Sequence, residues 1–396
     1  MSDRQSLNGP LWALKGCFVS LGIGANILFA RYPALQAQFN LSNGDWGWVL
    51  FALGLGGLTA FPLNRSLLGR WGSRAMIRRC GVLKGLWLAS LPWAPNKAAL
   101  LLAVYGLGVV INSINVAMNS QAALLESKSN RRSMGRLHAT FYLGTTFSAL
   151  LSGALVAGGC SLQTHLALVG AFLALTYWQL SGPLLPGLRA TNQQEDLSLS
   201  DRRIAGLGVL AALAAVAEGG VNGWITLYLH QVLGASESVA ALGMAVFSMA
   251  MMTGRFLTDS HADRWGAPRV VRLGTCLAAL ALGAAVVSQS LPLTFLALAV
   301  AGLGQAATFP LLFSSAGRLG GNAIPGVASM GSGGSLIGPF LLGRVAASSS
   351  LPAVLLTVAG GLLAVSWRAK SLRGHGHETG ANAQLAEPPA GQRRTD

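Results

Sequence analysis

The chain has 396 residues, of which 10% are charged and 52% hydrophobic, and a formal net charge of +15. Because soluble domains carry roughly 25% charged residues, this composition excludes an ordinary soluble protein and indicates several membrane spans. The basic residues form short clusters between apolar runs. That pattern reports membrane topology, so we expect no nucleic-acid partner.

Twelve apolar segments predict twelve transmembrane helices, because about 20 apolar residues cross a bilayer. Six lie near 12–30, 46–63, 80–94, 98–123, 137–158 and 163–185, and six more near 204–229, 237–258, 268–290, 292–316, 325–347 and 351–367. We expect residues 12–30 to remain as the first span, since the loop charges require it. The predicted fold is an all-α membrane protein of two six-helix bundles, 1–185 and 204–368, with a cytoplasmic connector over 186–203 and a disordered cytoplasmic tail over 369–396.

Most basic residues follow the even-numbered segments: Arg65, Arg70, Arg74, Arg78, Arg79, Lys128, Arg131, Arg132, Arg136, Arg189, Arg202, Arg203, Arg264, Arg269, Arg272 and Arg318. The other loops carry little beyond Arg31, Lys97 and Arg344. Because cytoplasmic loops carry the excess of Lys and Arg, we expect both termini in the cytoplasm.

The four cysteines, Cys17, Cys80, Cys160 and Cys276, lie far apart without metal-ligand spacing. No nucleophile and base stand at usable spacing. The Gly and Ser residues of 329–335 lack a P-loop lysine and predict close helix packing. We therefore expect no metal, no cofactor and no enzymatic activity.

The two halves of the chain repeat a short motif. Arg70-Trp71-Gly72 recurs as Arg264-Trp265-Gly266, at an offset of 194 residues, and both copies follow the second segment of their half. A parallel duplication of six-helix units predicts this placement, and such folds bind solute between the halves near the midplane.

Asp263-Arg264-Trp265-Gly266 resembles the cytoplasmic signature loop of the major facilitator superfamily, whose core is Asp-Arg-x-Gly. The first copy departs from that core, because Gly69 stands where the signature has Asp. The resemblance implies a gating role for Arg70, Gly72, Asp263, Arg264 and Gly266. It places the charged latch in the second half rather than the first.

Further segments resemble a bacterial branch of that superfamily near the fucose-permease-like and rhizopine-transport-like membrane proteins. They are Arg31-Tyr32-Pro33-Ala34-Leu35, Val116-Ala117-Met118-Asn119, His138 with Leu143-Gly144, Ala217-Glu218-Gly219 with Asn222 and Trp224, Gly302-Leu303-Gly304 with Phe309-Pro310, and Gly338-Pro339 with Gly343. Asn115 and Gln121 stand where the branch often has acids, which argues against a second proton site on the fourth helix. The resemblance implies the bacterial inner membrane and a sugar- or cyclitol-like solute.

Glu218 is the only acid in its apolar segment and is predicted to lie near the membrane midplane. Because acids at that depth are costly and usually functional, we interpret it as a proton-coupling residue, with a structural hydrogen bond as the alternative. Asn222 shares its helix face. Trp224 is a candidate for stacking on the solute, or is ordinary packing.

Amides supply the other candidate solute contacts. Asn112, Asn115 and Asn119 are spaced three and four apart, which places them on one helix face. Gln305 and Thr308 share a face of the tenth segment in the same way. Each set either binds solute or makes polar contacts between helices.

Four other basic residues each allow two interpretations. His138 is either a cap or part of a proton path, because its ordinary pKa lies near 6.5. Arg31 either extends to lipid headgroups or contacts the solute. Lys84 and Arg255 are interpreted as structural or gating residues, with Arg255 paired to Asp259 one turn on.

The predicted function is secondary active transport of a small polar solute by alternating access, coupled to protons through Glu218 and performed by a monomer. The alternatives are proton-driven efflux of amphipathic compounds and a non-transporting membrane sensor. The sensor would need a partner-binding domain, and the sequence has only an 18-residue connector and a tail of about 28 residues outside the spans.

Overall fold

The computed structural model describes residues 7–129, 134–186, 202–319 and 323–372. All regular elements in these residues are helices. In the first half they are α2 (Asn8–Ala30), α3 (Tyr32–Gln38), α4 (Asn43–Ser90), the 3₁₀ turn η1 (Leu91–Trp93), α5 (Lys97–Ser129), α6 (Met134–Ala157) and α7 (Leu162–Leu180).

The second half continues with α8 (Arg202–Leu227), the π-helical turn η2 (Tyr228–Val232), α9 (Glu237–Trp265), α10 (Ala267–Ser288), α11 (Leu291–Ala306), α12 (Thr308–Gly317), α13 (Ala323–Ser348), α14 (Leu351–Arg368) and the 3₁₀ turn η3 (Ala369–Leu372). Each predicted segment is helical. The tenth is divided into α11 and α12 at Ala307. Most of the predicted connector, with Arg189, and most of the predicted tail lie outside the described residues, as do Arg131 and Arg132.

The predicted loop between the second and third segments is wrong, because α4 is helical through it. A straight helix of its 48 residues would be roughly 72 Å long. Instead, Gly56 abuts Tyr105 while Gly106 abuts the Trp87 ring, so both parts of α4 lie beside the same level of α5. The chain therefore doubles back, and the two predicted spans are the two arms of α4.

The turn occurs at Gly72, which has φ 72° and ψ 161°. Gly266, between α9 and α10, has φ 78° and ψ 143°. Backbone in this region is almost confined to glycine. The repeated Arg-Trp-Gly motif thus makes the same tight turn in both halves, which explains why glycine ends each copy.

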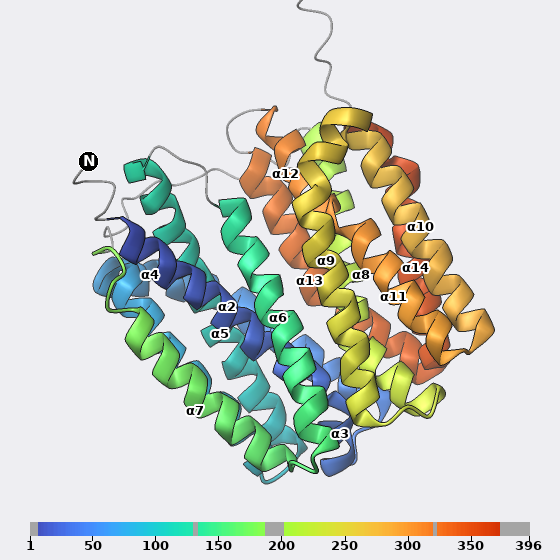
Figure 1. Ribbon diagram of the computed structural model, residues 1–396, viewed down its shortest axis with the longest axis horizontal. Coiled ribbons are helices and arrows are strands. Elements are labelled where there is room, and N and C mark those ends of the chain that lie inside the picture. The colour runs from blue at the N-terminus through green and yellow to red at the C-terminus, as the bar shows by residue number, and fades with distance from the viewer. Residues whose placement is uncertain (1–6, 130–133, 187–201, 320–322, 373–396) are drawn as a thin grey trace, which may run out of the picture.

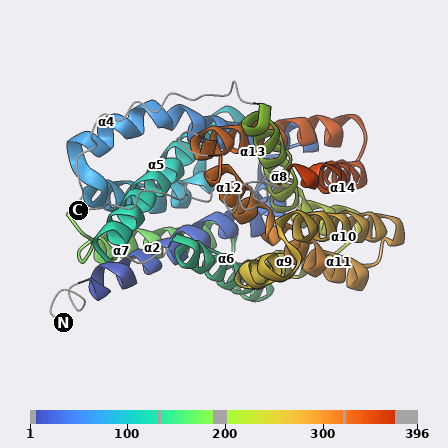
Figure 2. The same cartoon turned by 90° about the horizontal axis from the view of Figure 1, so that it is seen from above.

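The helices form two bundles, seen on the left and right of Figure 1 and from above in Figure 2. In the first bundle α2 packs against α6 and α7, and α4 packs against α5 and α7; in the second, α8 packs against α13 and α14, and α11 against α9 and α10. Across the bundles α6 packs against α9 and α4 against α13. Within the described residues, nine helices are long and apolar enough to cross a membrane. α4 counts once among these nine but supplies two spans. α7 and α13 are the remaining helices of the two bundles.

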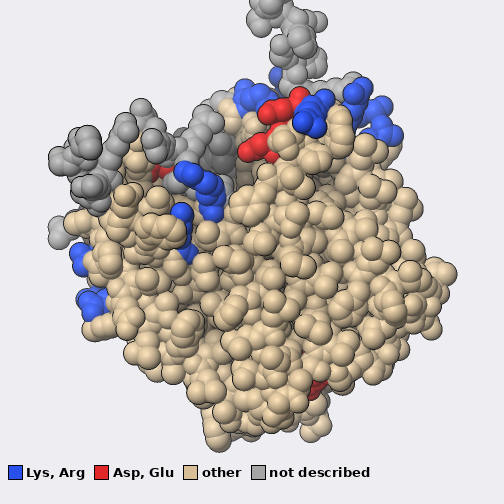
Figure 3. All heavy atoms as spheres, viewed as in Figure 1, with Lys and Arg blue, Asp and Glu red and all other residues tan. Residues whose placement is uncertain are grey.

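The two ends of the molecule differ in charge. We call the end with the Gly72 and Gly266 turns the basic end, and the end with α3 and the start of α9 the opposite end. Figure 3 shows Lys and Arg side chains gathered along the upper and upper-left margins, above a broad surface almost without charge. A wide uncharged band of this kind is the surface expected to face lipid.

Candidate functional site

The candidate site is a charged cluster around Glu218, at the contact between the bundles. The Tyr142 hydroxyl of α6 donates a hydrogen bond of 2.8 Å to Glu218 Oε1. Arg255 of α9 places Nη2 3.8 Å from Glu218 Oε2 and donates from the same nitrogen to the Tyr142 hydroxyl at 2.9 Å. The three side chains therefore join one helix of the first bundle to two of the second.

Close helix packing brings this cluster together. Gly153 of α6 lies against Ser238 and Leu242 at the start of α9, and further along the same pair of helices Tyr142 meets Arg255. The side chains of Arg255 and Glu218 are 16% and 20% exposed. Both side chains are thus largely withdrawn from solvent, but neither is fully buried.

The predicted pairing of Arg255 with Asp259 is wrong. Both residues are on α9 one turn apart, but the guanidinium of Arg255 turns toward α8 and α6, where Glu218 and Tyr142 lie. Glu218 is the stronger partner because its carboxyl is largely withdrawn from water, whereas Asp259 is exposed.

His138 lies one turn before Tyr142 on α6, so the two residues share a helix face. Its ring is half-buried and meets the Phe18 ring edge-on, with 5.1 Å between centroids. The structure places His138 beside the cluster on the side nearer the start of α6. Its role in a proton path stays a prediction.

The predicted amide stripe on α5 is divided in two. Asn112 accepts a hydrogen bond of 2.8 Å from Asn64 of α4, which identifies it as polar packing between helices. Asn119 donates to Asn115 at 3.0 Å, and its own Oδ1 is buried without a partner among the described residues. The pair Asn115 and Asn119 is half-buried and retains hydrogen-bonding capacity for a solute.

The remaining candidates on the second bundle differ in accessibility. Asn222 is half-buried, one turn from Glu218. Trp224 is fully buried in the core, so stacking on a solute would require that core to open. Gln305 and Thr308 flank the break at Ala307, and both are buried with Gln305 Nε2 and Thr308 Oγ1 lacking partners in the described part of the chain.

Arg31 is buried, so the prediction that it extends to lipid headgroups is wrong. Its side chain is 5% exposed, and Nη1 lies 3.4 Å from Glu237 Oε2 at the start of α9. Next to it, Gln231 donates to Gln36 Oε1 at 2.6 Å. These contacts join the bundles at the opposite end, and withdrawal from water lowers the pKa of Arg31 from its ordinary value.

The signature-loop residues lie at the basic end, where Gly72 itself is buried. Arg70, Asp263 and Arg264 are exposed, and among the described ion pairs none involves Asp263. Gly72 and Gly266 form the two turns. Any latch role of these residues remains a prediction, and in this conformation the charged side chains face outward.

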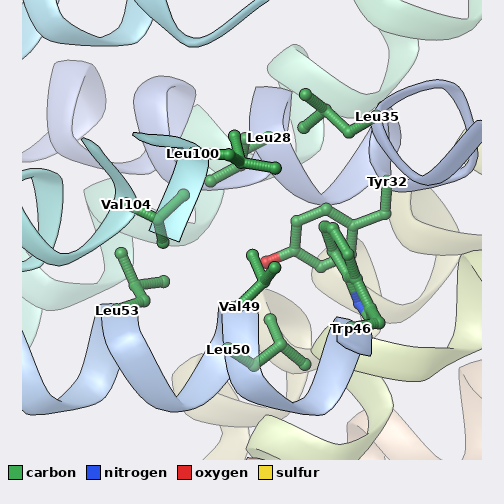
Figure 4. Close-up of a pocket in the computed structure, with 9 residues that line it drawn as sticks. All are labelled: Leu28, Tyr32, Leu35, Trp46, Val49, Leu50, Leu53, Leu100 and Val104. Atoms are coloured by element: carbon green, nitrogen blue, oxygen red, sulfur yellow. The ribbon is translucent and has the colours of Figure 1, made fainter. Parts of the chain in front are cut away.

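Three hollows lie away from the charged cluster. The one in Figure 4 holds about 10 Å³ and is lined by apolar side chains and Tyr32, whose hydroxyl points toward Val49. A hollow of about 440 Å³ at the opposite end is lined by residues that include Gln36 and Gln231, and a groove of about 580 Å³ runs between α9, α10 and α11 near Trp265. The groove is mostly apolar, and its exposed side chains include Leu257, Trp265, Leu273, Leu277 and Leu303, as expected of a lipid contact.

Metal binding has no support in the described residues, which contain no group of three His, Cys, Asp or Glu able to hold an ion. The same residues contain a fully buried cation, Lys84, whose Nζ donates to the Leu21 carbonyl at 3.3 Å. Lys84 is enclosed by α2 and α7 within the first bundle. Its described contacts, with Leu21, Gly24 and Tyr177, all lie in that bundle.

Sequence reasoning missed Tyr142 and Glu237 as partners. Tyr142 lies 76 residues from Glu218 in the sequence, so no local pattern connects them. The available signal was the spacing from His138, because a second polar aromatic residue one turn on marks the same face. Glu237 begins α9 and looks like an ordinary first-turn acid.

Two helical bundles that meet around charged residues at membrane depth have the architecture of secondary transporters. The sequence profile of the Major Facilitator Superfamily matches residues 14–339 and 207–390. An uncharacterized transporter of Sinorhizobium fredii, y4wD, is 31% identical over 352 residues, which are 86% of this chain and 92% of that protein. The chain therefore belongs to the Major Facilitator Superfamily.

Two further comparisons agree with this assignment. Membrane protein MosC of Rhizobium meliloti is 26% identical over 82% of this chain and 81% of its own length. The crystal structure of the nucleoside transporter NupG matches with a TM-score of 0.74 at 14% identity, covering 92% of this chain and 99% of that one. The second likeness concerns the fold alone. The expected fold and membership of the superfamily are confirmed, and the family is one of multi-pass membrane transporters, not enzymes.

Proposed function

We propose that this transporter moves a small polar solute across the bacterial cytoplasmic membrane by alternating access, coupled to protons through Glu218. The observation that carries the proposal is the hydrogen bond from Tyr142 to Glu218, because it links a titratable carboxyl to the other bundle. Glu218 gains a proton only by weakening its attraction to Arg255. Protonation would then change the contact between the bundles.

The basic end would face the cytoplasm, with both termini on that side, because cytoplasmic loops carry the excess of Lys and Arg. Residues 1–185 and 204–368 would be the two rocking units of a monomer. The contacts that join them, Arg31 with Glu237 and Gln231 with Gln36, lie at the opposite end. The conformation described here would therefore be closed toward the outside.

Hydroxyl groups of the solute would contact the amides of Asn115, Asn119, Asn222 and Gln305. Support comes from the polar atoms of Asn119 and Gln305 that have no partner among the described residues. Burying such atoms costs free energy unless they form a hydrogen bond, which a solute hydroxyl would supply. His138 would pass protons between the basic end and the cluster. Arg31, which we expected among solute contacts, is better assigned to the closed outer contact.

The test is proton movement in proteoliposomes loaded with a pH-sensitive dye, with sugars, cyclitols, amino acids and amphipathic cations as probes. We expect a polar probe to move protons in the wild type, and Glu218→Gln to abolish this while retaining solute exchange. Tyr142→Phe keeps the ring but removes the hydroxyl, and should slow coupled transport more than exchange.

The matched control is Asp45→Asn, which changes a carboxyl to an amide in the exposed pair with Lys97. It should leave proton movement unchanged. Solute exchange by the wild type with no proton movement would refute coupling through Glu218. Proton movement driven by amphipathic cations alone would contradict uptake of a polar solute and favour the efflux function.

A further inference from the structure

Arg255 is a permanent cation at membrane depth, and its pairing is incomplete. A guanidinium keeps its proton at any physiological pH. Its closest approach to Glu218 is 3.8 Å, which is longer than a charge-assisted hydrogen bond. Its Nε is buried and has no partner among the described residues. The group thus has a donor to offer to another acceptor.

Few other charges are near enough to compensate it. The titratable groups close to Glu218 and Arg255 are Tyr142 and, one turn on, His138. On the described helices packed against α8 and α9, the other Lys, Arg, His, Asp and Glu side chains lie within eight residues of a helix end. Glu218 is therefore the counter-ion of Arg255 in this conformation.

Protonation of Glu218 changes the charge of the site from zero to +1. Moving a net charge through the middle of a bilayer is strongly unfavourable. A neutral solute leaves that +1 in place, whereas a monovalent anion returns the site to zero. The loaded and empty sites are then both neutral, and only the two half-loaded forms are charged.

We infer that the solute is a hydroxylated monocarboxylate whose carboxylate binds Arg255 in place of ionised Glu218. The inference rests on the proposed function and names its substrate class. A carboxylate accepts two parallel hydrogen bonds from a guanidinium, and the amides of Asn115 and Asn119 provide for hydroxyl groups on the same molecule. The Tyr142 hydroxyl remains available to donate to Glu218 or to the carboxylate of the solute.

This arrangement also gives tight coupling. With a proton alone the site carries +1, and with the anion alone it carries −1, so neither form crosses easily. Proton and anion bind cooperatively, since each lowers the electrostatic cost of the other. Transport moves one proton with one negative charge and is electrically neutral.

The experiment compares D-gluconate and D-glucuronate with D-glucose and myo-inositol in the same proteoliposomes, with and without an imposed potassium diffusion potential. We expect the two acids to move protons, binding to strengthen as pH falls, and the rate to be independent of the potential. A neutral probe moved with a proton would instead carry net charge and respond to the potential.

Variants separate the two ionic groups. Arg255→Gln should weaken binding of the acids about 10- to 100-fold, as expected for a lost hydrogen bond to a charged group. Arg255→Lys keeps the charge and should recover part of that loss. Glu218→Gln should bind the acids with little dependence on pH, because no carboxylate then competes for Arg255. Arg318→Gln, an exposed arginine at the basic end, is the control and should bind as wild type.

Three results would overturn the inference. The first is proton movement with the neutral probes but not with the acids. This result would contradict the inference and still agree with the proposed function. The second is potential-dependent transport of the acids. The third is acid binding unaffected in folded Arg255→Gln. No proton movement with any probe contradicts the inference and the proposed function together.

Discussion

Two carboxyls at the opposite end of the molecule form ion pairs in different surroundings. Glu237 faces Arg31, whose side chain is 5% exposed, whereas Asp45 faces Lys97, which is 51% exposed. Removing one partner of a buried pair leaves the other charge without compensation, whereas exposed pairs contribute little. The same change of carboxyl to amide should therefore have unequal effects.

We expect Glu237→Gln to lower the free energy of unfolding by about 1–3 kcal/mol, since Glu237 itself is partly solvated. Asp45→Asn should cost about 1 kcal/mol or less. The measurement is the thermal midpoint of each variant by size-exclusion chromatography after heating in detergent. Equal midpoints would show that burial of Arg31 does not make its pair important.

Lys84 tests a second aspect of burial. The side chain is fully enclosed; among the described residues its one hydrogen bond goes to a backbone carbonyl, and its Nζ lies 6.0 Å from the centre of the Tyr177 ring. Lys84→Met removes the buried charge at similar volume and should raise stability by about 0–3 kcal/mol. Lys84→Ala also removes the charge but leaves a cavity, and should be about 2–5 kcal/mol less stable than the Met variant. A Met variant less stable than wild type would mean that the bond to Leu21 matters more than the charge.

At the scale of elements, glycines set how closely the helices approach. A Cβ at Gly56 would collide with the Tyr105 carbonyl, and one at Gly108 with the Leu53 carbonyl, so α4 and α5 meet backbone to backbone. Gly283 of α10 has nothing within 4 Å of the same position. The chain thus contains glycines required by packing and a glycine that is not.

We predict that Gly108→Ala lowers the free energy of unfolding by about 1–3 kcal/mol or more, because the backbone of α4 at Leu53 must move away. Gly283→Ala should raise it by about 0.5–1 kcal/mol, since alanine favours helix and meets no obstacle. Both follow from the same thermal measurement. A Gly108→Ala protein as stable as wild type would mean that α4 and α5 are less tightly packed than described.

The elements also show which patterns predict structure. Apolar runs located every span because lipid requires them. The basic cluster at 65–79 suggested a loop, but helix continues up to Gly72 and resumes at once, since a single glycine suffices for the turn. The break at Ala307 lies between Gly304 and Pro310, and Pro310 has no N–H to donate to the carbonyl of Ala306 four residues back, but neither residue shows in the apolar pattern. Composition predicts where a chain crosses the membrane better than how it turns.

At the scale of the whole molecule, the two bundles are held together at the opposite end by α4 and α13. A Cβ at Gly44 would lie 3.0 Å from the Ala347 Cβ, and Gly47 meets Gly343 backbone to backbone. Disulfides form between residues whose Cβ atoms are about 3.5–4.5 Å apart. This contact is within reach of a crosslink after small adjustment.

We expect the double variant Gly44→Cys with Ala347→Cys to form a disulfide on oxidation and to stop solute exchange, with recovery on reduction. The single variants should keep exchanging under the same oxidant, although Cys17, Cys80, Cys160 and Cys276 are present in each. Full exchange by the crosslinked protein would mean that the bundles need not separate at this end.

The candidate site could be predicted only in part. Glu218 was identifiable because it is a lone acid in an apolar run. Its partners were not, because Tyr142 and Arg255 reach it only through the packing of α6, α8 and α9. Arg31 was misjudged for the same reason, since a charge at a segment end looks alike whether it faces lipid or a carboxyl across the bundles.

The order of the cluster along the chain has a consequence for biosynthesis. Tyr142 precedes Glu218, and Arg255 follows it by 37 residues. At elongation rates of about 5–20 residues per second, roughly 2–7 s pass between synthesis of the acid and of its cation. The acid is thus made after the hydroxyl that bonds it and before its counter-ion. The nascent protein completes the charge balance of the Glu218 cluster only when α9 has been made.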